Sequence, residues 1–208
     1  MKDIEIIQPW SSFIIKSKLP SNILKKLIKV TEECDKKNEY LKEEITRLPY
    51  EEVKEDVIPF IEGCANIYAQ KQYEQNYPLI EKKFEWNLKL SNLWYVDTFD
   101  NQYSPLHSHT KCSVSGALYI KLPDYLPDRK IEVPGVRLDS NIVFTGAGMR
   151  GRFSNPQIQF HPEVGDIFIF PAHQLHMVQP FQSVDGKGVR RCVAFSARVR
   201  GRREINAR

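Results

Sequence analysis

The sequence contains no long hydrophobic run, and its charges of opposite sign nearly balance. Within the first twenty residues, charged side chains such as Asp3, Glu5 and Lys16 interrupt the apolar stretches. A signal-peptide core or a membrane span needs an unbroken apolar segment, so neither is expected. We therefore expect a soluble chain that has no membrane partner and stays in the cytoplasm.

Cysteine is also scarce. The four cysteines are far apart and form no C-x-x-C pair; they are Cys34, Cys64, Cys112 and Cys192. This spacing argues against a zinc knuckle or a compact disulfide framework, and it fits a reducing intracellular compartment. With 41% hydrophobic and 27% charged residues in 208 positions, the composition is that of a globular protein with one substantial core.

The small excess of positive charge is concentrated at one end. Against 26 Asp and Glu the chain has 30 Lys and Arg, a formal net charge of +4. Residues 197–208 hold five arginines and one glutamate, so the remainder is close to neutral. A basic end can bind nucleic acid or an acidic partner. The commoner case is a short solvated tail, and that interpretation is preferred here.

Two helices are expected ahead of a β-rich region. Pro20-Ser21-Asn22 precedes apolar residues at helical spacing, which predicts a capped amphipathic helix. A second helical segment is predicted over about residues 51–75, where Pro59 and Gly63 suggest a break or a late start. Both are interpreted as scaffolding that packs against a sheet.

From Phe84 onward the sequence changes to short runs of β-branched and aromatic residues. Turn signals such as Pro134-Gly135 and Asp185-Gly186 separate these runs. Many short strands joined by turns predict a sandwich or barrel. The expected fold is a single α+β domain, with a helical lead-in over residues 1–83, a β core over 84–199 and a basic tail over 200–208.

Three histidines form the candidate metal site. His107 and His109 lie one residue apart on a predicted strand, so both side chains point to the same side and can share one ion. His176 follows a strand and turn that end at Pro171, and in a barrel this strand end can neighbour that of His107. Iron that activates oxygen is typically held on one face by two histidines and a carboxylate, which leaves positions open for a co-substrate and O₂. Here the candidate face is formed by the three histidines.

Two other histidines are weaker candidates for this site. His173 competes as the third ligand, because it lies only three residues before His176. It falls in the tight connection, however, whereas His176 begins the next apolar strand, so His176 is preferred. His161 precedes Pro162 in a turn and is interpreted as an ordinary surface histidine.

Arg190 is the candidate anchor for an anionic co-substrate. Strand alternation places it on the face of small residues that would line the inside of a barrel. An unpaired charge is costly there, and the guanidinium group can bind a carboxylate through two hydrogen bonds. Arg191 would then face outward into solvent, although a slip in register would exchange the two. Tyr119 and Ser115 share a strand face and could hydrogen-bond the same carboxylate, while a core aromatic role for Tyr119 stays open.

With these residues in place, the chain resembles the 2-oxoglutarate- and Fe(II)-dependent oxygenases, in particular a branch of such enzymes found in phage genomes. The resemblance covers about residues 84–199 and depends on an ordered set rather than on one motif. The set is His107-x-His109, Ser115-Gly116, Tyr119, Gly165-Asp166, Phe170-Pro171, His176, Arg190 and Phe195.

The resemblance implies a double-stranded β-helix, the jelly-roll barrel, with N-terminal helices that buttress one sheet. It further implies that His107, His109 and His176 bind Fe(II), and that Arg190, with Tyr119 and Ser115, holds 2-oxoglutarate. The expected activity is that of a dioxygenase using O₂, a hydroxylase similar to prolyl hydroxylases, which converts 2-oxoglutarate to succinate while it hydroxylates a substrate C–H bond. A phage origin would place it in the host cytoplasm.

One departure from the wider family affects the metal. Most members have Asp or Glu where this sequence has His109, although the His-x-His form is usual in the phage branch. A site of three histidines loses one negative charge, makes its iron a stronger electrophile and can accept other metals. If His109 is not a ligand, Asp97 or Asp100 could supply a carboxylate, though neither has the usual spacing.

Two other functions are weighed against the oxygenase. A cupin with a three-histidine metal also fits Gly165, Pro171 and His176, but the Glu of its first motif is absent: Ser113 and Val114 stand there. A non-enzymatic β-barrel binding module would not explain three histidines and an arginine in this order.

The substrate is open at this stage. A peptide, a protein or a small molecule is expected, and nucleic acid only through the arginine-rich end. Residues 141–152 could form a substrate-side loop, but a solvated hairpin connection is preferred. The sequence gives no oligomeric state.

Overall fold

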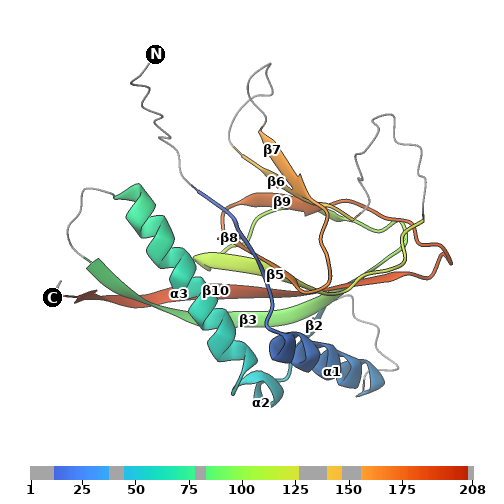
Figure 1. The fold of residues 1–208 in the computed structure, drawn as a ribbon, viewed down its shortest axis with the longest axis horizontal. Coiled ribbons are helices and arrows are strands. Elements are labelled where there is room, and N and C mark those ends of the chain that lie inside the picture. The colour runs from blue at the N-terminus through green and yellow to red at the C-terminus, as the bar shows by residue number, and fades with distance from the viewer. Residues whose placement is uncertain (1–11, 38–44, 78–82, 127–139, 147–155, 206–208) are drawn as a thin grey trace.

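The protein consists of two facing antiparallel sheets with helices on one side (Figure 1). A computed structural model describes residues 12–37, 45–77, 83–126, 140–146 and 156–205. Two facing sheets with supporting helices are the expected α+β double-stranded β-helix, so the predicted fold class is confirmed.

The larger sheet has six strands in the spatial order β1-β8-β5-β10-β3-β2. All of its strand pairs are antiparallel. In chain order the strands are β1 (Ile15–Lys18), β2 (Ile45–Arg47), β3 (Lys83–Phe99), β5 (Val114–Lys121), β8 (Asp166–Pro171) and β10 (Val189–Ile205).

The smaller sheet has four strands in the order β4-β9-β6-β7. Its strands are β4 (Ser104–His107), β6 (Ile142–Thr145), β7 (Gln157–Phe160) and β9 (Leu175–Val178). Between the two sheets lies an inner core of buried side chains: Ala117, Tyr119, Ile142, Phe144, Phe168 and Phe170.

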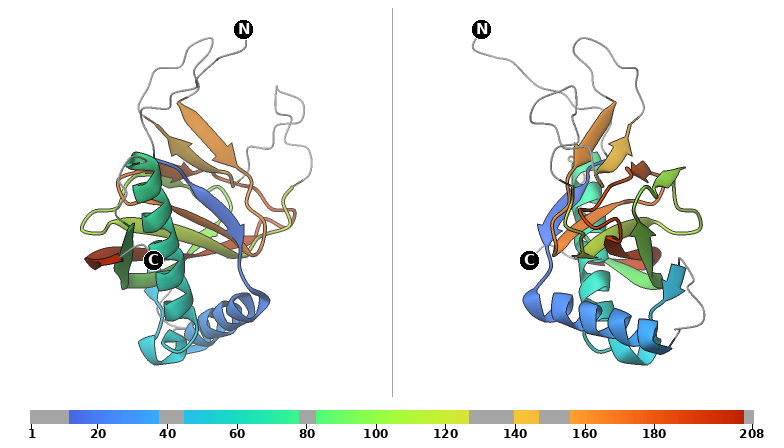
Figure 2. Two further views of the ribbon diagram at one scale, coloured as in Figure 1. Left: turned by 60° about the vertical axis from the view of Figure 1, so that its left-hand side comes forward. Right: turned by 90° about the vertical axis from the view of Figure 1, so that its right-hand side faces the viewer.

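The helices lie on the other side of the six-stranded sheet from the smaller sheet (Figure 1, Figure 2). They are α1 (Ser21–Lys37), α2 (Tyr50–Val53) and α3 (Val57–Asn76). Apolar residues at helical spacing, such as Leu27 in α1 and Ile61 in α3, are fully buried against the outer face of that sheet. This packing forms a second, larger core.

The second predicted helix is interrupted, at a different place from the one expected. The break falls between Val53 and Val57, where Asp56 caps α3 by accepting a hydrogen bond from the Val57 N–H at 2.6 Å. Pro59 lies in the first turn of α3, where its missing N–H has no intrahelical partner to lose. Gly63 lies inside the helix and does not end it.

Alternation along β5 decides which residues reach the space between the sheets. Val114, Leu118 and Ile120 pack toward the helices, whereas Ala117 and Tyr119 belong to the inner core. Gly116 faces the helices at a close approach: a Cβ there would lie 2.2 Å from the Phe195 ring. Glycine is therefore required at this position.

The observed strands extend beyond the segments expected from the sequence. The lead-in contributes β1 and β2 to the larger sheet, so it is not purely helical. Residues 200–205, expected in a basic tail, continue β10 in register with β3. Within the described residues, no helix is long and apolar enough to cross a membrane.

Candidate metal and co-substrate site

His107, His109 and His176 converge at one end of the barrel, and we call them the histidine cluster. One ring nitrogen from each lies within 4.8 Å of the others. His107 ends β4 and is the register partner of His176 in β9. His109 follows β4, where its backbone N–H donates to the Ala172 carbonyl at 2.8 Å. Strand pairing thus joins histidines that are far apart in the sequence.

Backbone carbonyls orient two of these rings. Nδ1 of His107 lies 2.7 Å from the Pro105 oxygen, and Nδ1 of His176 lies 2.9 Å from the Gln174 oxygen. A carbonyl oxygen only accepts hydrogen bonds, so each Nδ1 carries a proton and each Nε2 is the nitrogen left for a metal. Metal-ligating histidines are oriented by second hydrogen bonds of this kind.

Burial keeps two of the three imidazoles in the cluster uncharged. The pKa of His109 falls to about 4, chiefly through burial and then through its neighbour His107. Burial also lowers the pKa of His176 to about 4, against an opposing contribution from the Gln174 carbonyl. Phe170, with its ring centroid 4.7 Å from that of His176, supplies part of this apolar environment. Near neutral pH both imidazoles are therefore neutral and able to ligate a metal.

The other histidines lie apart from the cluster. His173 is exposed, as expected of a residue in the tight connection. His161 is half-buried rather than fully solvated, because Nδ1 pairs with the Asn141 side chain at 3.1 Å. Its ring also contacts that of Tyr125, with centroids 5.2 Å apart.

Neither alternative carboxylate joins the cluster. Asp97 lies on the helix side of the sheet and accepts a hydrogen bond from Arg191. Asp100 accepts two hydrogen bonds from Ser183, from its backbone N–H at 2.8 Å and from its hydroxyl at 2.7 Å. The donors gathered here are therefore three imidazole nitrogens, a set that suits iron as well as zinc, copper and nickel.

Arg190 lies inside the barrel with only 2% of its surface exposed. Its guanidinium donates to the Ser140 hydroxyl at 3.1 Å and to the Thr98 hydroxyl at 2.9 Å. Its Nε is buried and has no hydrogen-bond partner in the part of the chain that the structure describes. Both partners are neutral, so the described residues leave a buried cation without a counter-charge, an arrangement that is costly unless an anion binds there.

Arg191 points to the opposite face of β10, as alternation predicts, but it is not solvated. It is 5% exposed and donates to Asp97 from Nε at 2.7 Å. It also pairs with Asp35 of α1 at 2.6 Å, and it lies over the Tyr95 ring. The ion pairs satisfy its charge and tie α1 to the sheet.

Tyr119 and Ser115 differ in what they can offer a ligand. Tyr119 is 1% exposed, and burial raises the pKa of its phenol far above the usual value, while Arg190 nearby has a smaller lowering effect. The phenol is thus a neutral donor. The Ser115 hydroxyl donates to the Phe195 carbonyl at 2.8 Å. A hydrogen bond from this hydroxyl to a carboxylate would have to replace the one to Phe195, so the expected role of Ser115 stays a prediction.

Thr98 and Ser140 were not among the residues selected from the sequence, yet they hold the Arg190 side chain. Alternation from Trp94 along β3 could have placed Thr98 on the inner face. Ser140 has no such signal, because it lies in a turn with φ 61°, and its approach to Arg190 depends on the tertiary fold.

A family model described as "Putative 2OG-Fe(II) oxygenase", where 2OG is 2-oxoglutarate, matches residues 92–196. The chain belongs to this family. Its cofactors are accordingly Fe(II) and 2-oxoglutarate, and it is a 2-oxoglutarate-dependent oxygenase rather than a cupin or a non-enzymatic module. The matched segment contains every residue of the histidine cluster and Arg190. The phage branch has no support beyond the sequence resemblance.

Solved structures share the fold at low sequence identity. A prolyl-4-hydroxylase from Pseudomonas putida is 13% identical, with TM-score 0.53 and coverage of 90% of this chain and 93% of that one. A Trichoplax adhaerens prolyl hydroxylase, in complex with a hypoxia inducible factor peptide fragment, is 9% identical, with TM-score 0.54. The alignment covers 89% of this chain and 82% of that one.

HygX from Streptomyces hygroscopicus, solved with nickel and 2-oxoglutarate bound, is 10% identical, with TM-score 0.53 and coverage of 89% of this chain and 81% of that one. At these identities the likeness establishes the jelly-roll fold alone. No curated protein matches the chain.

Proposed function

We propose that this oxygenase is a hydroxylase in which the histidine cluster holds Fe(II) and Arg190 holds the distal carboxylate of 2-oxoglutarate. The observation that carries the proposal is the buried Arg190 guanidinium, which among the described residues has two neutral partners and an unpartnered Nε. It lies in the same barrel as three imidazoles, each with one ring nitrogen within 4.8 Å of the others. A dianion with one end on a metal and the other on an arginine suits this pair of sites.

The residues of the cluster fit the metal by their donor chemistry. When bound, Fe(II) supplies the activation of O₂ for oxidation. The chain supplies two ring orientations, fixed by the carbonyls of Pro105 and Gln174. It also supplies the neutral imidazoles of His109 and His176, from which a metal does not have to displace protons near neutral pH. The described residues add no carboxylate to this set, which makes it less selective among divalent metals.

Arg190 would fix the co-substrate at the other end. Thr98 and Ser140 hold the guanidinium plane through two of its nitrogens, so the fork is oriented before the ligand arrives. A carboxylate bound there gains charge-assisted hydrogen bonds and offsets the cost of the buried cation. The neutral phenol of Tyr119, near Arg190 on the inner face, would donate a further hydrogen bond.

The proposed reaction balances without any further reductant. One atom of O₂ enters succinate as CO₂ leaves 2-oxoglutarate, and the other becomes the hydroxyl of the substrate. We propose a peptide, a protein or a small molecule as that substrate. The Trichoplax prolyl hydroxylase is solved with a peptide fragment, which supports trying peptides, with proline as the first target residue.

We further propose that the helices and the barrel act as one domain in the cytoplasm. Both sides of the larger sheet are buried, one against the helices and one against the smaller sheet. Removal of the lead-in would expose the larger of the two cores.

Succinate formation from 2-oxoglutarate tests the proposal. Protein loaded with Fe(II) under nitrogen should form succinate when air is admitted, since such enzymes turn over slowly without their substrate. His176→Ala and Arg190→Ala should abolish it. His173→Ala is the matched control, because that exposed residue lies in the same connection, and it should retain the activity. Equal activity in Arg190→Ala would contradict the role of Arg190.

A further inference from the structure

The larger sheet narrows to a two-stranded ribbon at the end of the barrel that carries the histidine cluster. Val114, the first residue of β5, pairs with Ala197 of β10. Beyond Ala197, β10 pairs only with β3 among the described residues, as far as Ile205 opposite Lys83. Residues 83–89 and 198–205 thus form a ribbon, which extends past the barrel toward the end marked C (Figure 1).

One backbone edge of this ribbon is open. The edge of β10 that β5 covers up to Ala197 has no strand partner beyond that residue within the described chain. The Val199 N–H reaches the Ser113 hydroxyl at 3.4 Å, and residues 200–204 are exposed. Six residues at the usual strand rise give an edge of roughly 20 Å, enough to pair with an extended peptide of about six residues.

Basic side chains dominate the ribbon. Six are basic and two acidic: Lys83, Lys89, Arg198, Arg200, Arg202 and Arg203 against Glu85 and Glu204. Arg200 is exposed, and Arg203, 80% exposed in its side chain, pairs with Glu85 at 2.5 Å. An exposed ion pair of this type contributes little to stability, so both arginines are available to a ligand.

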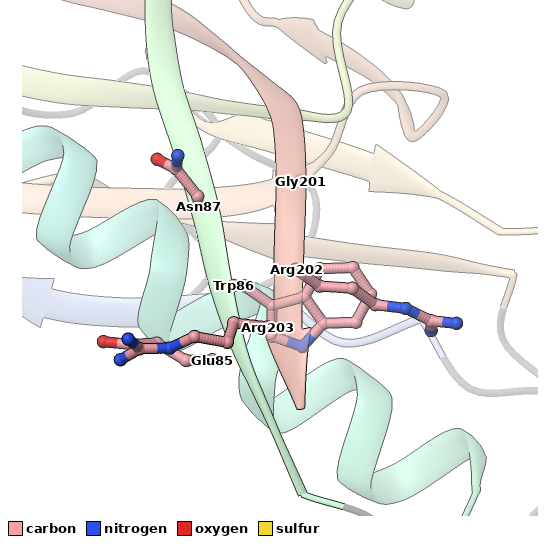
Figure 3. Close-up of a pocket in the computed structure, with 6 residues that line it drawn as sticks. All are labelled: Glu85, Trp86, Asn87, Gly201, Arg202 and Arg203. Carbon is pink, nitrogen blue, oxygen red and sulfur yellow. The ribbon is translucent and has the colours of Figure 1, made fainter. Parts of the chain in front are cut away.

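Two hollows mark this surface. One of about 420 Å³ is lined by residues of both strands, and Figure 3 shows Arg202 and Arg203 there, pointing away from each other. The Cζ atom of Arg202 lies over the Phe84 ring, 4.3 Å from its centroid. A second hollow of about 400 Å³ is lined by Lys111, Cys112, Ser113, Arg198 and Val199.

The second hollow connects the ribbon to the histidine cluster. Lys111 lies two residues after His109, and its carbonyl accepts a hydrogen bond from Arg198 Nε. A chain bound along the open edge of β10 would therefore run toward the loop that carries His109. Because the ribbon is connected to the histidine cluster in this way, its basic residues are better candidates for substrate binding than basic residues elsewhere on the surface.

We propose that the open edge of residues 200–205 binds an extended acidic segment of the substrate by β-strand addition. The inference deepens the proposed function, because it assigns the substrate's docking chemistry. Backbone hydrogen bonds would add a strand beside β10, and alternate carboxylates would meet the arginines.

An acidic peptide fits better than nucleic acid. The Arg202 guanidinium lies over the Phe84 and Trp86 rings, where it would compete with base stacking, and Glu85 and Glu204 would repel a phosphate backbone. Charged side chains on an edge strand also protect against self-association. Protection against self-association alone would give the ribbon no affinity for a peptide. A peptide-binding measurement therefore distinguishes a docking role from a purely protective one.

The probe is a fluorescein-labelled peptide of about twelve residues in which Glu and Thr alternate, so that all carboxylates share one strand face. Its fluorescence anisotropy is titrated with the full chain, with and without added Fe(II). Binding should be the same in both, because the ribbon lies outside the histidine cluster. Fluorescence anisotropy therefore measures peptide binding independently of turnover. Succinate formation measures 2-oxoglutarate turnover independently of peptide binding.

Arg200→Glu combined with Arg203→Glu should weaken binding at least about tenfold. Lys25→Glu combined with Lys29→Glu is the matched control: it makes the same charge change on exposed positions of α1 and should leave the affinity unchanged. A peptide with prolines in place of alternate threonines, which lacks the N–H groups of those residues, should also bind at least about tenfold more weakly.

Three outcomes would overturn the inference. The first is no binding at protein concentrations of about 1 mM. The second is equal weakening in the Lys25 and Lys29 control, which would indicate a net-charge effect only. The third is tighter binding of a labelled twelve-residue thymidine oligonucleotide together with insensitivity to proline, which would assign the ribbon to nucleic acid.

Discussion

Arg190 and Arg191 are neighbours in β10 whose guanidinium groups point to opposite faces of one sheet and meet opposite electrostatic conditions. Arg191 is paired with Asp97 and Asp35 on the helix side. Within the described residues, the guanidinium of Arg190 has only the hydroxyls of Thr98 and Ser140 as partners. The fold compensates one buried cation and leaves the other for a ligand, so substitutions at the two sites should have different consequences.

Asp97→Ala should destabilise the fold, because it removes the main counter-charge of a buried arginine. Breaking one side of a buried pair costs about 3–5 kcal/mol, and Asp35, which is 47% exposed, should reduce that loss somewhat. Urea unfolding measures the change. Lys71→Ala, which removes an exposed pair with Glu74, should change little. Equal stability of Asp97→Ala and the unsubstituted protein would contradict this account of Arg191.

Two glycine substitutions should change the stability of the fold in opposite directions. Gly116→Ala would place a Cβ 2.2 Å from the Phe195 ring and 2.7 Å from the Phe168 carbonyl, so overpacking should cost about 1–3 kcal/mol or more. Gly63→Ala meets nothing within 4 Å and lies inside α3, so it should stabilise by about 0.5–1 kcal/mol. Thermal unfolding would show both, and a stable Gly116→Ala would mean that β5 and β10 are not packed as described.

Asp166 should make the fold sensitive to acid. Burial alone would raise the pKa of this carboxyl, but hydrogen bonds from Lys18, the Glu163 N–H and Lys16 outweigh burial and leave it below its ordinary value. A depressed pKa stabilises the fold fully above the unfolded value of about 3.9 and loses that contribution as the pH falls through the folded value.

Urea unfolding at several pH values measures this dependence. Asp166→Asn should be less stable near neutral pH and should lose less stability than the unsubstituted protein below about pH 4. Parallel stability curves for the two proteins in that range would show that Asp166 is not the group responsible.

Substitutions at His109 should separate metal binding from metal choice. His109→Ala should weaken iron binding by more than the roughly 10–100-fold that loss of an outer partner costs. His109→Asp restores a carboxylate and should keep iron while it lowers the affinity for copper relative to iron. Competition dialysis with Fe(II) and other divalent ions measures both. Undiminished iron binding in His109→Ala would remove His109 from the ligand set.

The sequence was sufficient for the features that depend on local periodicity. Apolar residues at helical spacing predicted α1 and α3, and alternation in β10 predicted that Arg190 and Arg191 face opposite ways. His107 and His109 could be selected together because a single intervening residue separates them. Each of these inferences needs only the geometry of one helix or one strand.

Features that depend on contacts between distant segments could not be predicted. The pairing of Arg191 with Asp35 joins residues 156 positions apart, and the expected solvation of Arg191 was wrong for that reason. The support of Arg190 by Ser140 depends on how the two sheets face each other. Residues 200–205 looked like a tail because arginine-rich composition gives no sign of a partner strand in β3.

Anaerobic binding of radiolabelled 2-oxoglutarate to Fe(II)-loaded protein tests the central claim most directly, because it reads the metal and the co-substrate separately. Arg190→Ala should keep its iron and lose at least about tenfold in affinity for 2-oxoglutarate, and Arg190→Lys should recover part of it. His176→Ala should lose both ligands, and His173→Ala neither. If Arg190→Ala binds 2-oxoglutarate as tightly as the unsubstituted protein, or His176→Ala retains its iron, the assignment of this site is wrong.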